Sequence, residues 1–303
     1  MEETKTVITG ASGWLGRELI RILVEENKIS PLNLHLIAST AKKFKINRNK
    51  FITKKYNDIN ESQEIENYFD FAFLTREKIN TLGPKKYTEA NIGIINNSVE
   101  LVKNLKPKNV ILSSSGAVYK IGKNWKQAGN SLYSDLKILQ EAKLKEVCKE
   151  IGANLTTIRI FNLSGNGITK INDFAISQFI SKALNNEKIS IESNYLVNRS
   201  YCDISQLLNT FISATKSGYS GTVDSTGIKI ELRDLAKLVI KELKSKSKFE
   251  APEVIKGSLP DNYFSDSEDY SILLRKYCGE RTFSIEEQIQ KTMTSMIKTR
   301  ITK

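Results

Sequence analysis

The sequence predicts an α/β protein with a doubly wound parallel sheet and a smaller, mainly helical C-terminal lobe. In the first half of the chain, short apolar runs alternate with amphipathic stretches of helical period. That alternation places helices on both faces of a parallel sheet. Beyond residue 165 the alternation loosens, and expected helices are joined by longer polar segments. We therefore expect a first domain over residues 1–165 and a lobe over residues 166–303, some segments of which return to the first domain.

The elements follow from the apolar pattern. Strands are expected at residues 6–9, 34–38, 69–74, 110–113 and 155–160. Helices between them are expected at residues 14–26, 88–104 and 132–151, and later helices at 173–185, 204–215, 231–244 and 284–298. Ligands of such sheets bind at the carboxyl ends of the strands. Residues that directly follow these strands are therefore the first candidates for a site.

The composition excludes several classes of protein. The chain has 303 residues, of which 40% are hydrophobic and 26% charged, an ordinary globular balance. It contains neither an apolar run of the roughly 18 to 20 residues that span a bilayer nor the pattern of a signal peptide. One histidine and three scattered cysteines give no metal-ligand spacing, disulfide framework or His-based triad. We expect a reduced, cytoplasmic, metal-free protein that does not insert into a membrane.

The net charge of +12 raises the question of an anionic partner. Nucleic acid or an anionic membrane would be attracted by such a charge. The lysines are scattered and interleaved with glutamates, however, and the chain has neither an RNP-type motif nor a Cys/His finger. We therefore expect a lysine-rich surface and no nucleic-acid partner, with a field that would also attract a phosphorylated small substrate.

A glycine-rich segment directly follows the first expected strand. Gly10, Gly13 and Gly16 have the spacing that allows a tight turn, close approach to a pyrophosphate and close helix–strand packing. The helix that follows offers N–H groups at its N-terminus to phosphate oxygens. We expect a Rossmann-type dinucleotide-binding domain over residues 1–165. The residues of this segment expected to bind the cofactor are Gly10, Ser12, Gly13, Trp14, Leu15 and Gly16.

The residues after the second strand favour NADP over NAD. NAD-binding sheets usually carry an acidic residue there, which binds the ribose 2′-hydroxyl. Residues 39–43 read Ser-Thr-Ala-Lys-Lys, and these hydroxyls and ammonium groups, together with Arg17, suit a 2′-phosphate. The alternative is a solvated basic turn, which leaves NAD open. Farther along, Asp58 suits an adenine amine. The residues of this region expected to bind the cofactor are Ser39, Thr40, Lys42, Asp58 and Ile59.

A tyrosine and a lysine have the spacing of a catalytic pair. Tyr133 and Lys137 are four residues apart and so share one face of a helix. A nearby ammonium stabilises a tyrosinate and lowers the pKa of the phenol, which makes Tyr133 usable as an acid or base. A serine cluster, residues 113–115, follows an expected strand, and a hydroxyl there can hydrogen-bond a reacting alcohol or carbonyl oxygen.

At this point the sequence resembles the extended short-chain dehydrogenase/reductase family, specifically the epimerase/dehydratase group that acts on nucleotide sugars. The matching motifs run along nearly the whole chain. They are TGxxGxxG at residues 9–16, the Tyr and Asn of the family's YxxxNxxG segment at Tyr87 and Asn91, Ser-Ser-Ser-x-x-Val-Tyr at residues 113–119, YxxxK at 133–137, RxFN at 159–162 and an R-D-[YF]-like Arg199-Ser200-Tyr201.

The resemblance implies roles for individual residues and a homodimer. Tyr133 would be the proton donor or acceptor, Lys137 would bind the nicotinamide ribose and tune Tyr133, and Ser115 would contact the reacting oxygen. The further cofactor-binding residues that it implies are Leu74, Thr75, Asn91 and Ser113, beside Tyr133 and Lys137 themselves. The substrate-binding residues that it implies are Ser114, Ser115, Asn162, Arg199 and Tyr263.

Three departures from the family pattern narrow the chemistry. Gly116 and Ala117 stand where the dehydratases carry Asp-Glu, so the carboxyl groups that elimination needs are missing. Residues 73–77, Phe-Leu-Thr-Arg-Glu, replace the family's HLAA segment, and Arg76 or Glu77 is expected to face the cofactor or substrate. Tyr263 begins a segment that stands where many relatives carry an Arg-x-x-Asp that grips the second phosphate.

These observations leave three functions open. The first is an NADPH-dependent reductase of a nucleotide-linked 4-keto sugar. The second is a nucleotide-sugar 4-epimerase with retained NAD, and the third is a non-catalytic NADP-binding regulator. An epimerase regenerates its own cofactor, whereas a reductase must exchange it, so cofactor retention separates the first two. The sugar and the nucleotide are not determined by these motifs.

Overall fold

The computed structural model describes residues 5–59, 64–122, 128–168 and 171–301. The chain divides into two compact units. The first comprises residues 1–120, 124–159 and 211–223, and the second comprises residues 121–123, 160–210 and 224–303. The long N-terminal part of the first unit ends at residue 159, and residues 211–223 return to this unit.

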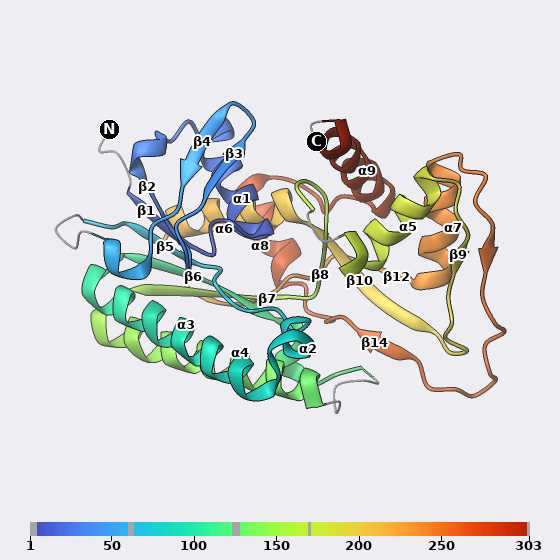
Figure 1. The fold of residues 1–303 in the computed structure, drawn as a ribbon, viewed down its shortest axis with the longest axis horizontal. Coiled ribbons are helices and arrows are strands. Elements are labelled where there is room, and N and C mark those ends of the chain that lie inside the picture. The colour runs from blue at the N-terminus through green and yellow to red at the C-terminus, as the bar shows by residue number, and fades with distance from the viewer. Residues whose placement is uncertain (1–4, 60–63, 123–127, 169–170, 302–303) are drawn as a thin grey trace. The chain divides into compact units, whose positions relative to one another are not determined.

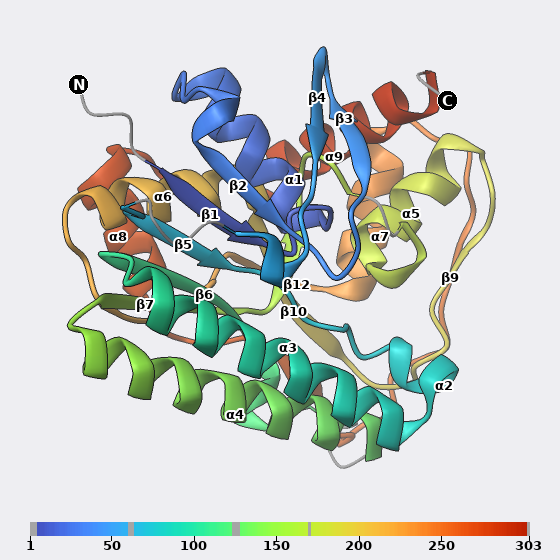
Figure 2. The same ribbon diagram turned by 60° about the vertical axis from the view of Figure 1, so that its left-hand side comes forward.

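The first unit is built on a sheet with the strand order β11-β7-β6-β5-β1-β2 (Figures 1 and 2). Its strands are β1 (Thr6–Thr9), β2 (Leu34–Ile37), β5 (Asn67–Asp70), β6 (Asn109–Ser115), β7 (Asn154–Ile160) and β11 (Gly221–Asp224). β1 pairs in parallel with β2 on one side and with β5 on the other. The strand order therefore reverses at β1, and its carboxyl end is the switch point where such sheets bind ligands. The predicted α/β class with a parallel sheet is confirmed.

Helices cover both faces of this sheet. α3 (Pro84–Leu105) and α4 (Ala128–Ile151) lie side by side on one face (Figure 2). Their buried side chains pack with residues of the strands, among them Val7, Tyr68 and Val110. Because side chains alternate along a strand, the fully buried Ile8 points to the opposite face, which α1 (Trp14–Arg21) covers. α1 continues as a π-helical turn, Ile22–Glu26, and α2 (Lys78–Leu82) precedes α3.

The strand expected at residues 69–74 is β5, but the prediction is wrong for residues 71–74, because β5 ends at Asp70. The backbone N–H groups of the next two residues donate to Thr9 Oγ1, at 3.1 and 3.2 Å. The N–H of Leu74 donates to the Asn91 side chain at 2.9 Å. Side chains thus take the amide groups that a neighbouring strand would otherwise take, and the chain leaves the sheet after Asp70.

A hairpin that the sequence analysis did not predict follows β2. It consists of β3 (Lys43–Ile46) and β4 (Asn49–Ile52), which pair antiparallel. Arg17 of α1 holds it, since its Nη2 donates to the Lys45 carbonyl at 2.8 Å and its guanidinium lies 5.0 Å from the ring centroid of Phe44.

The second unit contains a sheet in addition to the expected helices. β10 (Val197–Asp203) lies between β12 (Ile228–Glu231) and β14 (Asp261–Tyr263), and β8 (Asn162–Ser164) pairs with β10. β9 (Ile189–Ser190) and β13 (Phe249–Glu250) form a separate pair. The helices are α5 (Ala175–Leu184), α7 (Leu232–Glu242), α8 (Asp269–Cys278), α9 (Ile285–Ile301) and α6 (Ile204–Lys216), the last of which ends in the first unit. The expectation of a mainly helical lobe missed this sheet because β8, β12 and β14 have only three or four residues, and β10 is rich in polar residues.

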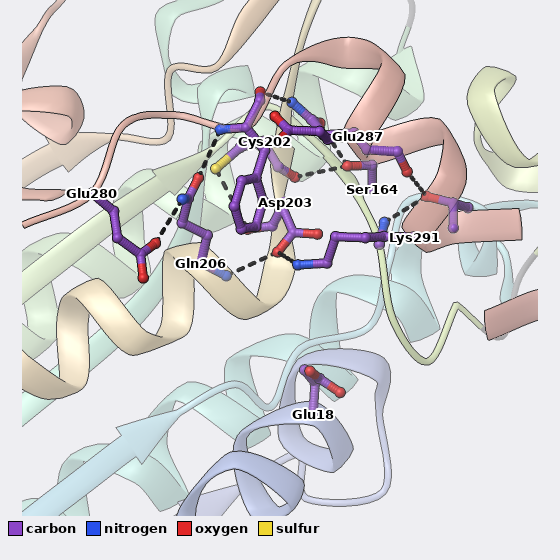
Figure 3. Close-up of polar contacts among 12 residues, drawn as sticks. Glu18, Ser164, Cys202, Asp203, Gln206, Glu280, Glu287 and Lys291 are labelled. Atoms are coloured by element: carbon purple, nitrogen blue, oxygen red, sulfur yellow. Dashed lines mark hydrogen bonds and ion pairs between the residues drawn. The ribbon is translucent and has the colours of Figure 1, made fainter. Parts of the chain in front are cut away.

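Buried polar contacts tie α9 and α6 to β10 in the second unit (Figure 3). The fully buried carboxylate of Asp203 accepts from Lys291 Nζ at 3.0 Å and from the Gln206 backbone N–H at 2.9 Å. The neighbouring Cys202 is also fully buried and serves as a small core residue. None of the helices described is both long and apolar enough to cross a membrane.

Candidate active site

The glycine-rich loop lies at the carboxyl end of β1, where the strand order reverses. Gly10 has a φ of +63°, and a Cβ there would lie 2.6 Å from the main chain of Phe71. A Cβ on Gly16 would lie 2.6 Å from both Ala11 Cα and the Gly10 carbonyl oxygen. Gly10 is therefore required by its left-handed turn and by the close approach of the chain after β5, and Gly16 by the close packing of α1 on the loop.

The N-terminus of α1 is open to a phosphate. Gly13 is the N-cap residue and has no side chain with which to cap the helix, and the first turn carries no acidic residue. Ser12 lies within the loop, Trp14 and Leu15 begin α1, and all three are half-buried. The N–H groups of a helix's first turn lack intrahelical partners and attract anions. The loop therefore fits the pyrophosphate of the dinucleotide that the sequence predicts.

The turn after β2 presents exposed hydroxyl and ammonium groups. Ser39, Thr40 and Lys42 are exposed. Their backbone is held by Thr53, whose hydroxyl donates to the Thr40 carbonyl at 3.0 Å and accepts from the Lys42 N–H at 2.9 Å. Arg17, considered with these residues, is engaged instead by the hairpin.

The two residues expected at the adenine, Asp58 and Ile59, make contacts within the first unit. The Asp58 carboxylate accepts from the Lys55 backbone N–H at 3.1 Å and so caps a 3₁₀ turn, Tyr56–Asp58. Ile59 packs against the apolar core beneath α3 and α4. Asp58 remains exposed.

Lys137 is buried in the interior of the first unit, one helical turn after Tyr133. Its ammonium donates to the Ser113 carbonyl at 2.9 Å and to Gln140 Oε1 at 3.0 Å. It also lies 3.9 Å from the ring centroid of Phe73, whose ring meets that of Tyr133 edge-on at 5.7 Å. Burial lowers the pKa of Lys137 to about 7, against the opposing effect of the carboxylates of Asp70 and Glu141. Tyr133 and Lys137 therefore share one face of α4, and both contact Phe73.

The serine cluster lies at the end of β6, and its members have different partners. Ser113 Oγ donates to the Asp70 carbonyl at 3.2 Å, and Ser114 Oγ donates to the Glu141 carboxylate at 2.5 Å. Ser115 Oγ accepts the N–H of Ala117 at 3.2 Å and caps a 3₁₀ turn, Gly116–Tyr119.

Helix α4 is fixed against that turn directly beside Tyr133. Ser134 Oγ donates to the Ala117 carbonyl at 2.8 Å. Together with the Lys137–Ser113 contact, this bond aligns residues 133–137 of α4 with residues 113–117 at the end of β6. The three residues expected to be catalytic, Ser115, Tyr133 and Lys137, therefore belong to adjoining segments of one unit.

Ser114 belongs to an ion-pair network that the motifs did not indicate. Glu141 receives Arg159 in a two-pronged contact, with nitrogen–oxygen distances of 3.0 and 2.7 Å. Arg159 also donates to the Tyr119 hydroxyl at 2.8 Å. The RxFN arginine thus holds α4 and the turn after β6 in place, and the Ser114 hydroxyl points toward this network.

Asn91 and Tyr87 fix the backbone after β5. Asn91 is fully buried, and its Oδ1 accepts the Leu74 N–H, while the Tyr87 hydroxyl donates to the Leu74 carbonyl at 2.7 Å. Leu74 is half-buried and Thr75 exposed. Asn91 therefore shapes the loop that carries Phe73.

Phe73 was not among the expected site residues. The sequence feature that could have indicated Phe73 is the departure of residues 73–77 from the family's HLAA segment. Among these residues, Arg76 and Glu77 were expected to face the cofactor or substrate. Arg76 is exposed and donates to Asn130 at 2.9 Å, whereas Phe73 contacts both Tyr133 and Lys137.

The remaining residues expected to bind the substrate, Asn162, Arg199 and Tyr263, lie on one sheet of the second unit. The register pairs Arg199 of β10 with Tyr263 of β14, and Asn162 of β8 lies beside Tyr201 of β10. Arg199 forms an ion pair with Asp261 at 2.8 Å and donates to two backbone carbonyls at 2.9 Å. Asn162 Nδ2 donates to the Ser200 carbonyl at 3.0 Å. The Arg199 guanidinium therefore already has an anionic partner within the chain.

The Rossmann-type sheet, the glycine loop and the Tyr-Lys pair define a dinucleotide-dependent enzyme. The chain belongs to the NAD-dependent epimerase/dehydratase family, whose model matches residues 6–223. This match confirms the resemblance drawn from the motifs. Among curated proteins, no sequence match was found.

Solved structures with this fold cover almost the whole chain. UDP-N-acetylglucosamine 4-epimerase from Methanobrevibacter ruminantium, in complex with UDP-N-acetylmuramic acid, is 21% identical with a TM-score of 0.77, covering 99% of this chain and 100% of that one. UDP-glucuronic acid 4-epimerase from Bacillus cereus, with UDP-glucuronic acid and NAD, is 18% identical with a TM-score of 0.75, covering 98% and 100%. UDP-glucose 4-epimerase from Thermus thermophilus, with NAD, is 14% identical with a TM-score of 0.73, covering 97% and 99%.

Proposed function

We propose that this protein is a nucleotide-sugar 4-epimerase that retains its nicotinamide dinucleotide. The observation that carries the proposal is the Tyr133–Lys137 pair, held on one face of α4 against the serine-bearing end of β6. The substrate class is supported by the three structures above, which are 4-epimerases of nucleotide sugars and match nearly the full length of this chain.

Each residue of the pair has a distinct task in this proposal. The bound nicotinamide supplies the acceptor and donor of hydride. The Tyr133 phenolate takes the proton from the sugar C4 hydroxyl and later returns it, while Ser115 hydrogen-bonds the same oxygen. Lys137 in its charged form stabilises the phenolate, because an adjacent cation favours the anionic form of a phenol. In the second unit, Asn162, Arg199 and Tyr263 are proposed to hold the nucleotide end of the substrate.

A specific observation favours a second candidate, the NADPH-dependent reductase of a 4-keto sugar. Residues 39–43 after β2 carry no carboxylate, and Ser39, Thr40 and Lys42 are exposed where a 2′-phosphate would need donors. A dehydratase is disfavoured by Gly116 and Ala117. A non-catalytic regulator is disfavoured by the retention of both Tyr133 and Lys137.

Cofactor retention decides between the two candidates. The freshly purified protein is denatured, and the small molecules released are identified and quantified by mass spectrometry. Near-stoichiometric NAD supports the epimerase and contradicts our interpretation of residues 39–43. An empty protein that binds added NADPH more tightly than NADH supports the reductase.

Turnover is the direct test of the substrate class. The protein is incubated with UDP-glucose, UDP-N-acetylglucosamine and UDP-glucuronic acid, and the C4 epimers are detected by proton NMR. 4-Keto sugar nucleotides with NADPH form the second series. Failure in both series, with a folded and cofactor-loaded protein, would contradict the proposal. The family resemblance further predicts a homodimer, and light scattering measures its mass.

A further inference from the structure

The carboxylate of Asp70 is fully buried at the end of β5. Its Oδ1 accepts from Thr9 Oγ1 at 2.6 Å and from Ser98 Oγ at 3.0 Å, and its Oδ2 accepts from Gln140 Nε2 at 3.0 Å. Thr9 Oγ1 itself accepts the two backbone amides that follow β5, which leaves its proton for Asp70. A carboxylate surrounded by donors is the arrangement that suits the ionised form.

Gln140 joins this carboxylate to Lys137. Its Oε1 accepts from Lys137 Nζ at 3.0 Å, and its Nε2 donates to Asp70. An ammonium can only donate, so Lys137 requires the amide oxygen on its side and thereby directs the amide nitrogen toward Asp70. Gln140 is fully buried, and its side chain thus links a buried cation to a buried anion.

Of the two carboxylates near Lys137, Asp70 is the one whose charge is available to favour the charged form of Lys137. Tyr133 and Glu141 of α4 lie near the Lys137 side chain. The Ser113 carbonyl of β6 accepts a hydrogen bond from its ammonium. Glu141 is already paired with Arg159, whereas Asp70 is connected to Lys137 through the Gln140 amide. Burial disfavours the charged forms of both lysine and aspartate, so each ion is favoured by the presence of the other.

We propose that Asp70 and Gln140 are positioning residues that keep the Lys137 side chain charged and fixed beside Tyr133. The inference rests on the proposed roles of Tyr133 and Lys137. It adds two residues that lie outside the motifs by which the chain resembles its family. Their action is indirect, since neither is assigned a contact with substrate or cofactor.

The first test measures Lys137 directly and needs no substrate. The protein is labelled with ¹³C at lysine Cε, and the Lys137 resonance is assigned by its loss in Lys137→Met. Its titration midpoint in the unaltered protein is expected at a pH of about 7. Asp70→Asn keeps the shape but removes the charge, so the midpoint is expected to fall by about one unit or more. Gln140→Met, which removes the bridge but keeps the bulk, is expected to lower it as well.

Ser98→Ala is the matched control. It removes one of the donors to Asp70 but keeps the carboxylate and the Gln140 bridge, so the Lys137 midpoint is expected to move much less than in Asp70→Asn, while the protein loses some stability. Unchanged midpoints in both Asp70→Asn and Gln140→Met would overturn the proposal. If Asp70→Asn does not fold, Gln140→Met decides by the same measurement.

The second test uses turnover. A lower Lys137 midpoint means that the ammonium is lost earlier as the pH rises. The alkaline limb of the kcat profile of Asp70→Asn is therefore expected to move to lower pH by the same interval as the NMR midpoint. A purely structural role would lower kcat equally at every pH and overturn the proposal. Because the NMR titration needs no activity, it stays decisive even if the proposed function fails.

Discussion

Replacing Gly16 by alanine tests the fit between α1 and the glycine loop. The new Cβ would lie 2.6 Å from Ala11 Cα and from the Gly10 carbonyl oxygen, and 2.9 Å from the Ala11 carbonyl carbon. All three atoms belong to the backbone, and unstrained carbon contacts are about 3.5 to 4.0 Å. The helix and the loop must therefore separate by roughly 1 Å to relieve these contacts.

The cost follows from this overlap. Overpacking costs about 1 to 3 kcal/mol, and replacing a helical glycine by alanine returns about 0.5 to 1 kcal/mol. We expect Gly16→Ala to lower the free energy of unfolding by up to about 2.5 kcal/mol. Since the shift displaces the first-turn amides proposed to bind the pyrophosphate, the affinity for the dinucleotide should also fall, by about tenfold or more.

Urea unfolding and cofactor titration measure the two effects. Tryptophan fluorescence is a suitable probe because Trp14 begins α1. Gly93→Ala, within α3, is the control, since no described heavy atom outside its chain neighbours and the nearby backbone of α3 lies within 4 Å of the added Cβ. That variant should gain about 0.5 to 1 kcal/mol and bind the cofactor normally. A Gly16→Ala protein with unchanged stability and affinity would refute both the packing argument and the placement of the dinucleotide.

Three further predictions concern the Tyr-Lys pair and the second unit. Tyr133→Phe should lower kcat by about 10²- to 10⁴-fold with unchanged dinucleotide affinity in calorimetry, and retained activity would remove its catalytic assignment. Burial lowers the pKa of Lys137 from 10.5 to about 7, so between these values the unfolded chain binds more protons and stability rises with pH. In urea unfolding, the free energy of unfolding of Lys137→Met minus that of the unaltered protein should therefore decline as the pH rises through that window. The slope is up to about 1.4 kcal/mol per pH unit, or about 5 kcal/mol over the whole window. A difference that does not change with pH would contradict this prediction. Asp203→Ala removes a fully buried carboxylate that is paired with Lys291, and should cost about 2 to 3 kcal/mol. The exposed Asp266→Ala should cost less than about 0.5 kcal/mol, and equal losses in thermal unfolding would argue against the role of Asp203.

Several parts of the fold followed from the sequence because they depend on neighbouring residues. The apolar run at Thr6–Thr9 forms β1 as expected. The spacing of Tyr133 and Lys137 was enough to place them on one helix face, since about 3.6 residues complete a helical turn. The polar strands of the second unit and the lysine-rich hairpin after β2 were missed because their apolar signal is weak, and their pairing depends on partners outside the strand itself.

The sequence alone determined the sheet class, the dinucleotide loop, the Tyr-Lys pair and the family, because each depends on spacing within a few residues or on a set of such motifs. Only the tertiary structure decided which groups meet across the sheet. It brought Asp70 to Gln140 and Lys137, Arg199 to Asp261, and Ser114 to Glu141, pairs separated by tens of residues. Such contacts depend on strand register and on which helix covers which face, and burial then fixes the charge and orientation of the groups that meet there.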